Sequence, residues 1–185
     1  MEPLRKIFWG FILLFFTFTI NNGPAKIVFL PAFVGYLILL ANSMKLASFA
    51  QSFRKIGTPL IVLSVFSGIN FITSLLGIVF TGTEAIASLI SIGFYLWMLF
   101  LMLNGLHEIA NRFELAYEGK QFTSLFPIFA GLHLISIIFF FILPGISLIS
   151  IIVELVVHIV FLVRLARFSR LDFTLYNQDQ PLEAL

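Results

Sequence analysis

Long apolar stretches separated by short polar segments dominate the sequence. There are six of them: Lys6–Ile20, Ile27–Asn42, Pro59–Phe80, Ala85–Asn104, Thr123–Leu143 and Ile146–Val163. A helix crosses the hydrocarbon core of a bilayer in about 20 predominantly apolar residues. The pattern therefore predicts an all-α fold, a polytopic membrane helical bundle with six transmembrane helices, in which residues 1–185 form a single integral membrane domain.

The polar connections between these stretches alternate in length. Three of them are very short and rich in turn-forming residues: Asn21–Lys26, Thr81–Glu84 and Pro144–Gly145. The connections between these turns are longer. This alternation predicts three tandem helical hairpins. Their boundaries are 1–57, 58–122 and 123–170, and a short polar C-terminal tail, 171–185, follows them.

The linker Ser43–Ile56 has apolar residues at helical spacings, with Lys45, Gln51 and Arg54 between them. Two structures fit this pattern. The linker can lie on the membrane surface as an interfacial helix, or it can extend the second span beyond the bilayer. The sequence leaves both alternatives open.

The hairpins resemble one another when the chain is compared with itself. An offset of 63 residues places Gly68 on Gly131 and Asn70 on His133, and it also places Gly82 on Gly145. Chance recurrence of glycine in apolar sequence is one explanation. If the repeat is real, three hairpins surround a central seam about an axis along the membrane normal.

Glycines at matching positions of the odd-numbered spans are candidates for close helix packing. They are Gly10, Gly68 and Gly131. Helices associate in lipid through small residues that let two backbones approach. We therefore expect a neighbouring helix to lie against each of these glycines.

The basic residues are distributed unequally between the two sides of the predicted bundle. If all six stretches span, ten of the eleven Lys and Arg residues share one side: Arg5, Lys6, Lys45, Arg54, Lys55, Arg112, Lys120, Arg164, Arg167 and Arg170. Lys26 alone lies on the other. By the positive-inside rule, both termini are cytoplasmic. Anionic lipids of the inner leaflet are the expected partners of these residues, at about 1 kcal/mol each.

Composition supports a membrane protein and excludes several other classes. The chain is 60% hydrophobic and 11% charged, which is more apolar surface than a soluble domain of 185 residues can bury. The lipid bilayer must cover the remainder. The basic residues are scattered over four short segments without a groove-reading module, so no nucleic-acid partner is expected. The absence of cysteine excludes disulfides, thiolate metal sites and cysteine nucleophiles.

Two N-terminal motifs resemble a known group of proteins. Trp9-Gly10 and the segment Leu30-Pro31-Ala32-Phe33-Val34-Gly35-Tyr36 are similar to the opening of small, uncharacterised multi-span membrane proteins of Gram-positive bacteria. In that group the proline is commonly followed by Asp, where this chain has Ala32. The resemblance covers about the first fifty residues. It implies a protein of the bacterial plasma membrane and transfers no activity or site residue.

Four polar residues fall at membrane depth and are the candidate site. Ionisable groups in mid-span cost about 2.5–3.5 kcal/mol on insertion scales, so each suggests a function. His133 lies in the fifth stretch, Glu154 and His158 lie in the sixth, and Asn70 matches His133 in the third. Counting about 1.5 Å per residue from the Pro144–Gly145 turn, His133 lies between Glu154 and His158 in depth. We therefore expect these three side chains to face one another.

A cluster of one Glu and two His residues has three interpretations. It can relay protons or bind a substrate, because imidazole titrates near neutrality. It can hold a divalent metal through two imidazoles and a carboxylate, although the sequence offers no second acidic ligand, and we predict neither a metal nor a cofactor. It can also fix the packing of two helices as a hydrogen-bonded trio. Tyr36, Tyr95, Trp9 and Trp97 are further candidates, either as pocket-lining residues or as interface anchors.

These observations favour two classes of function. The first is a small transporter, or the membrane-embedded substrate-binding subunit of one, with its site near the polar residues. The second is a non-catalytic membrane protein that regulates, assembles or confers immunity through a membrane protein partner. No catalytic motif is present, so an enzyme is not expected. A water-reachable cavity at the polar residues would favour transport, and a dry seam would favour the partner role.

Overall fold

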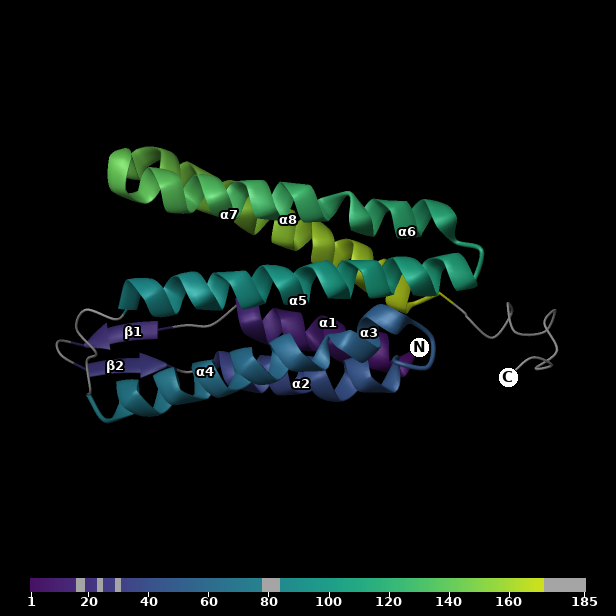
Figure 1. The fold of residues 1–185 in the computed structure, drawn as a ribbon, viewed down its shortest axis with the longest axis horizontal. Coiled ribbons are helices and arrows are strands. Elements are labelled where there is room, and N and C mark those ends of the chain that lie inside the picture. The colour runs from purple at the N-terminus through teal and green to yellow at the C-terminus, as the bar shows by residue number, and fades with distance from the viewer. Residues whose placement is uncertain (16–18, 23–24, 29–30, 78–83, 172–185) are drawn as a thin grey trace.

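The computed structural model describes residues 1–15, 19–22, 25–28, 31–77 and 84–171. The described elements are α1 (Glu2–Phe15), β1 (Thr19–Asn22), β2 (Ala25–Val28), α2 (Ala32–Lys45), α3 (Gln51–Lys55), α4 (Gly57–Leu75), α5 (Glu84–Arg112), α6 (Ala116–Thr123), α7 (Leu125–Ile142) and α8 (Pro144–Ser169). The helices lie side by side along the long axis of the molecule, and β1 and β2 form a small hairpin at one end (Figure 1).

The six longer helices form a ring, and the short helices α3 and α6 lie in the connections between them. In ring order, α1 contacts α2, α2 contacts α4, α4 contacts α5, α5 contacts α7, and α7 contacts α8. The ring closes because α8 contacts α1. Each of these helices therefore has one face toward the centre of the bundle and another toward its surroundings.

Four helices in the described part of the chain are long and apolar enough to cross a membrane. They are Gly57–Leu75, Ile86–Arg112, Ala116–Phe139 and Leu148–Ser169, and Ala32–Lys45 is a shorter apolar helix. Of these four, Ala116–Phe139 starts in α6 and continues through Pro127 into α7. The four later apolar stretches thus form helices of membrane length, and the first two form shorter ones.

The first two apolar stretches are shorter as helices because part of each is a β-strand. Thr19 pairs with Val28 and Asn22 with Ala25 in an antiparallel ladder. The predicted turn Asn21–Lys26 thus lies largely within two strands, and the predicted helices up to Ile20 and from Ile27 were wrong there. β-branched residues next to a turn sequence favour a hairpin over a helix.

The other two outer connections differ in what the structure describes. Thr81–Glu84 lies outside the described residues except for Glu84, where α5 begins. At the third connection α7 ends at Ile142 and α8 begins at Pro144, so Leu143 alone separates them. Pro144 and Gly145 belong to the first turn of α8 rather than to a loop. Proline suits this position because its φ is helical and its missing N–H has no partner there.

The linker after the second stretch contains the end of one helix and a second, short helix. The helix α2 extends to Lys45, and the short helix α3 follows before α4 begins at Gly57. The hydroxyl and the backbone N–H of Ser52 in α3 both donate to the carboxylate of Glu108 in α5, at 2.5 and 3.2 Å. Arg112 donates to the carbonyl of Ser48 at 3.2 Å. The linker is therefore attached to the end of α5.

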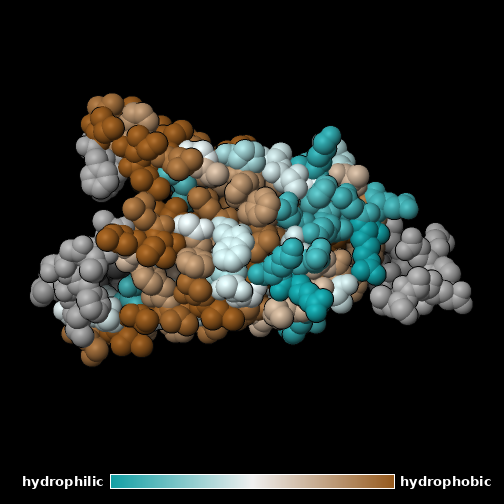
Figure 2. All heavy atoms as spheres, in the orientation of Figure 1, coloured by the Kyte–Doolittle hydropathy of each residue, from teal (hydrophilic) through white to brown (hydrophobic). Residues whose placement is uncertain are grey.

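Polar residues gather at one end of the bundle. The amino group of Met1 lies 3.4 Å from the carbonyl of Ser169, so α1 begins where α8 ends, at the same end of the bundle as α3 and α6. We call this the basic end, because the ten basic residues grouped by the sequence lie in the segments that meet there, whereas Lys26 lies in β2 at the opposite end. Figure 2 shows hydrophilic residues over the basic end and hydrophobic residues over much of the remaining face.

The buried core occupies the half of the ring nearer the basic end. Its fully buried members include Ile7, Phe53, Leu106 and Leu165, whereas Leu75 toward the opposite end is 61% exposed. Figure 2 shows the molecule hollowed at that opposite end, between the α7–α8 pair and the other helices. The helices thus pack tightly at one end and diverge toward the other.

Only one of the three predicted glycine contacts is present. A Cβ on Gly10 would lie 2.8 Å from Leu39 Cδ2 and 3.3 Å from the carbonyl oxygen of Gly35, so α1 and α2 cross there in close contact. Among the residues that the structure describes, none has an atom within 4 Å of a Cβ added to Gly68 or Gly131. The prediction of a close helix contact was wrong for these two, because the added atom would meet open space.

Candidate functional site

His133, Glu154 and His158 meet inside the ring, as their depth predicted. Glu154 Oε1 lies 3.1 Å from His133 Nδ1 and 3.9 Å from His158 Nδ1. The His133 contact has the distance of an ion pair but is not aligned as a hydrogen bond. The side chains of His133 and Glu154 are both 16% exposed. The helix α8 brings Glu154 and His158 to one face because they are four residues apart, and α7 brings His133 against that face.

Hydrogen bonds fix the orientation of His158. Its Nδ1 lies 2.8 Å from the backbone carbonyl oxygen of Glu154. Because a carbonyl only accepts, Nδ1 carries the hydrogen, and in the neutral ring Nε2 is an acceptor. Tyr95 of α5 donates its hydroxyl to Nε2 at 2.8 Å. The rings of Phe15 and Phe129 lie against the imidazole, with centroids 4.1 and 4.6 Å away.

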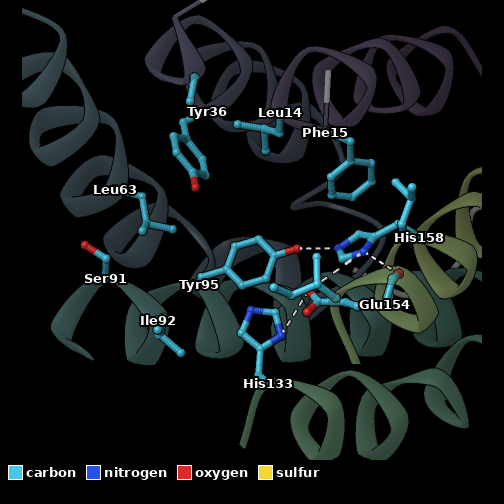
Figure 3. Close-up of a pocket in the computed structure, with 13 residues that line it drawn as sticks. Leu14, Phe15, Tyr36, Leu63, Ser91, Ile92, Tyr95, His133, Glu154 and His158 are labelled. Carbon is cyan, nitrogen blue, oxygen red and sulfur yellow. Dashed lines mark hydrogen bonds and ion pairs between the residues drawn. The ribbon is translucent and has the colours of Figure 1, made fainter. Parts of the chain in front are cut away.

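Tyr95 connects the two histidines. Besides its bond to His158, its ring stacks on His133, with the centroids 5.4 Å apart and the planes 25° apart. Figure 3 shows the Tyr95 ring next to His133 with its hydroxyl directed at His158, and Tyr36 directed toward the same space. Three helices thus contribute to the polar cluster, which we define as Tyr95, His133, Glu154 and His158.

The polar cluster lies on the wall of a cavity of about 420 Å³ that is open rather than enclosed. All six helices of the ring line it: Leu14 and Phe15 from α1, Ala32 and Tyr36 from α2, Leu63 from α4, Ser91, Ile92 and Tyr95 from α5, His133 from α7, and Ile151, Glu154, Leu155 and His158 from α8. Sites for small molecules have volumes of about 300–1,000 Å³, apolar walls and a few polar groups. This cavity has each of those properties.

Asn70 does not join the polar cluster. It lines a second cavity of about 370 Å³, together with Ser67, Ser88 and other residues. The two cavities share Tyr36 and Ser91 among their walls, so they adjoin. Asn70 is therefore apart from the other three candidates, because α5 stands between α4 and α7 in the ring.

Aromatic side chains close the cavity toward the basic end. Phe129 contacts His158, and its ring also lies 6.4 Å from the ring of Phe161. Phe161 packs edge-on against Phe11 at 5.0 Å, and all three phenylalanines are fully buried. These rings therefore lie on the basic-end side of His158, and the hollow in Figure 2 lies at the opposite end of the bundle.

The charged side chains of the cavity show which ligands it can hold. Among the described residues that line it, Glu154 is the one acidic side chain, and there is no Lys or Arg. Within the described ranges no group of three His, Cys, Asp or Glu residues is arranged to hold a metal ion. In the neutral ring, the single free lone pair of His158 is used by the Tyr95 hydroxyl. The cluster therefore has the geometry of a hydrogen-bonded site and not of a metal centre.

From the sequence, Tyr95 and Tyr36 are only further candidates, although their spacing along the chain is a signal for both. Tyr95 lies 59 residues after Tyr36 and 63 residues before His158. The same two offsets relate Gly23, Gly82 and Gly145. Of the four aromatic candidates, these two tyrosines line the cavity, whereas Trp9 is 57% exposed and Trp97 is 44% exposed.

Comparison of the chain with protein-family models, with characterised proteins and with solved structures finds no match. The functional argument therefore rests on the polar cluster and its cavity.

Proposed function

We propose that this chain is a small transporter, or the membrane-embedded substrate-binding subunit of one, and that its substrate or proton site is the cavity at Glu154. One observation carries this proposal. An open cavity reaches a carboxylate and two imidazoles in the middle of a ring of apolar helices. A trio that only fixed helix packing would need no such space. Ionisable side chains at membrane depth that face a cavity are typical of substrate and proton pathways.

The proposed membrane topology has six spans in three hairpins, with both termini in the cytoplasm. The distribution of basic residues supports it, because these residues gather at the end where α1 begins and α8 ends. The basic end then lies at the inner surface and can contact anionic lipids. The resemblance of the N-terminal motifs supports the bacterial plasma membrane as the location.

The hairpins are proposed to be repeats about an axis through the cavity. The second helix of each hairpin contributes one polar ring to the same cavity. These rings are Tyr36 of α2, Tyr95 of α5 and His158 of α8. Their spacings match those of the turn glycines. In this arrangement the described form opens toward the outside, and the layer around Phe129 and Phe161 closes the inner side.

Labelling of an introduced cysteine from both sides of the membrane tests this function. The chain has no cysteine, and Ser91 lines both cavities. We expect Ser91→Cys to react with an impermeant methanethiosulfonate in intact cells, and also from the inner side in inverted vesicles, because a transporter exposes its site alternately. Ile90→Cys is the matched control, since Ile90 is 52% exposed on the apolar surface. A thiol in hydrocarbon is not ionised and stays unreactive.

The outcomes separate the two classes of function. Reaction of Ser91→Cys from both sides, without reaction of Ile90→Cys, supports transport. Reaction from one side alone, or from neither, contradicts transport and favours a membrane protein that acts on a partner.

A further inference from the structure

We propose that the cavity binds a monovalent organic cation with a small apolar body, and that this cation displaces a proton from Glu154. This inference rests on the proposed function, because it names the class of substrate for the same site. The exchange is balanced: the ammonium pairs with the carboxylate, the carboxyl proton leaves to water through the open side, and the net charge of the site stays constant.

The first argument is the charge of the cavity. Glu154 is the one carboxylate among the described lining residues, and no Lys or Arg accompanies it. The titratable groups that face it are His133 from α7, His158 from α8, Tyr95 from α5 and Tyr36 from α2, whereas α1 and α4 contribute apolar side chains. An ionised carboxylate in a low-dielectric site needs a positive partner or a proton. An anionic ligand would instead be repelled.

The second argument is the hydrogen bonding of the histidines. In the neutral form both nitrogens of His158 are used, one by the Glu154 carbonyl and the other by the Tyr95 hydroxyl. His133 contacts Glu154 without an aligned hydrogen bond. A neutral His133 therefore gives Glu154 no positive partner, and Glu154 lines the cavity, where a ligand can reach it.

The third argument is the character of the walls. The rings of Tyr36, Tyr95 and Phe15 border the cavity, and the other side chains are mostly aliphatic, such as Leu63 and Leu155. Aromatic faces attract ammonium groups, more strongly when both are desolvated. Aliphatic walls suit the apolar part of the same molecule and leave a hydrated metal ion without enough oxygen ligands. One ligand class satisfies both the carboxylate and the walls.

The test compares two ligands of the same shape and different charge. Benzyltrimethylammonium is the cation, and neopentylbenzene is its uncharged carbon isostere. Binding to the full-length protein in lipid nanodiscs is measured by titration calorimetry, for the wild type and for Glu154→Gln. Proton release is followed with an indicator in weakly buffered solution.

We expect the wild type to bind the cation at least tenfold more tightly than the isostere. Glu154→Gln should bind the cation at least tenfold more weakly than the wild type and should bind the isostere unchanged. Affinity for the cation should rise with pH, because deprotonated Glu154 is the binding form. Proton release on binding should be present at low pH and disappear at high pH.

Equal affinity of the wild type for the two ligands would overturn the inference, and this comparison requires no variant to fold. Cation binding that is unaffected by Glu154→Gln, or that releases no proton at any pH, would overturn it as well. Failure here can be told apart from failure of the transport proposal. If Ser91→Cys reacts from both sides but the cation is not preferred, transport stands and this substrate class is wrong.

Discussion

The crossing of α1 and α2 gives the sharpest prediction about stability. Gly35 has no space for a side chain, because a Cβ there would lie 2.8 Å from Leu14 Cγ and 2.9 Å from the carbonyl oxygen of Gly10. Ordinary contact begins at 3.4 Å, so the two helices would have to separate by about half an ångström. Backbone cannot give way as a flexible side chain does. We expect Gly35→Ala to cost about 1–3 kcal/mol, the usual range for overpacking.

The same substitution at other glycines provides matched controls. At Gly10 the nearest atom is the end of the Leu39 side chain, which can rotate, so Gly10→Ala should cost less than Gly35→Ala. Gly68→Ala and Gly131→Ala meet open space and should be neutral or stabilising by up to about 1 kcal/mol, since alanine is the better helix former.

The free energy of unfolding can be measured by reversible denaturation in mixed detergent micelles, followed by circular dichroism. The order predicted for the loss of stability is Gly35 first, then Gly10, with Gly68 and Gly131 last. A Gly35→Ala protein as stable as the wild type would refute the close crossing. Equal losses at all four positions would show that alanine is generally unfavourable in these helices.

Three further predictions concern the ends of the bundle and the site. An impermeant thiol reagent should label Gly145→Cys in intact cells and should leave Ser48→Cys unlabelled; the reverse would overturn the topology. Ser52→Ala should cost about 1–3 kcal/mol, because it removes one of two bonds to Glu108, and an unchanged denaturation midpoint would contradict this. Glu154→Gln should fold as the wild type does and lose transport, because an amide cannot titrate. Retained transport would mean that His133, Glu154 and His158 only fix the packing of the helices.

The sequence predicts well those features that follow from local pattern. The four later apolar stretches form helices of membrane length, since their hydrophobicity and length require little else. The meeting of His133 with Glu154 follows as well, because a one-residue connection fixes the depth of α7 relative to α8. The β-hairpin is missed because four-residue strands of β-branched residues look like the ends of apolar helices.

Features that depend on the order of helices in the ring cannot be predicted from the sequence. The offset that matches Asn70 to His133 gives the same depth but cannot show that α5 stands between their helices. In the same way, Gly68 resembles Gly10 in its apolar sequence surroundings, but no described atom lies within 4 Å of a Cβ added to it. The role of Tyr95 depends on three helices meeting, although its spacing from Tyr36 and His158 was present in the sequence.

The site rests on one juxtaposition, in which Glu154 and Tyr95 contact two histidines inside the ring, and histidine nitrogen shifts report it directly. The chain has three histidines, and His107 at the basic end serves as an internal reference. With ¹⁵N-labelled histidine in lipid bilayers, Glu154→Gln should shift the nitrogens of His133 and His158. Tyr95→Phe should shift Nε2 of His158 by removing its donor. Both variants should leave His107 unchanged, whereas spectra in which neither substitution moves His133 or His158 would contradict the site.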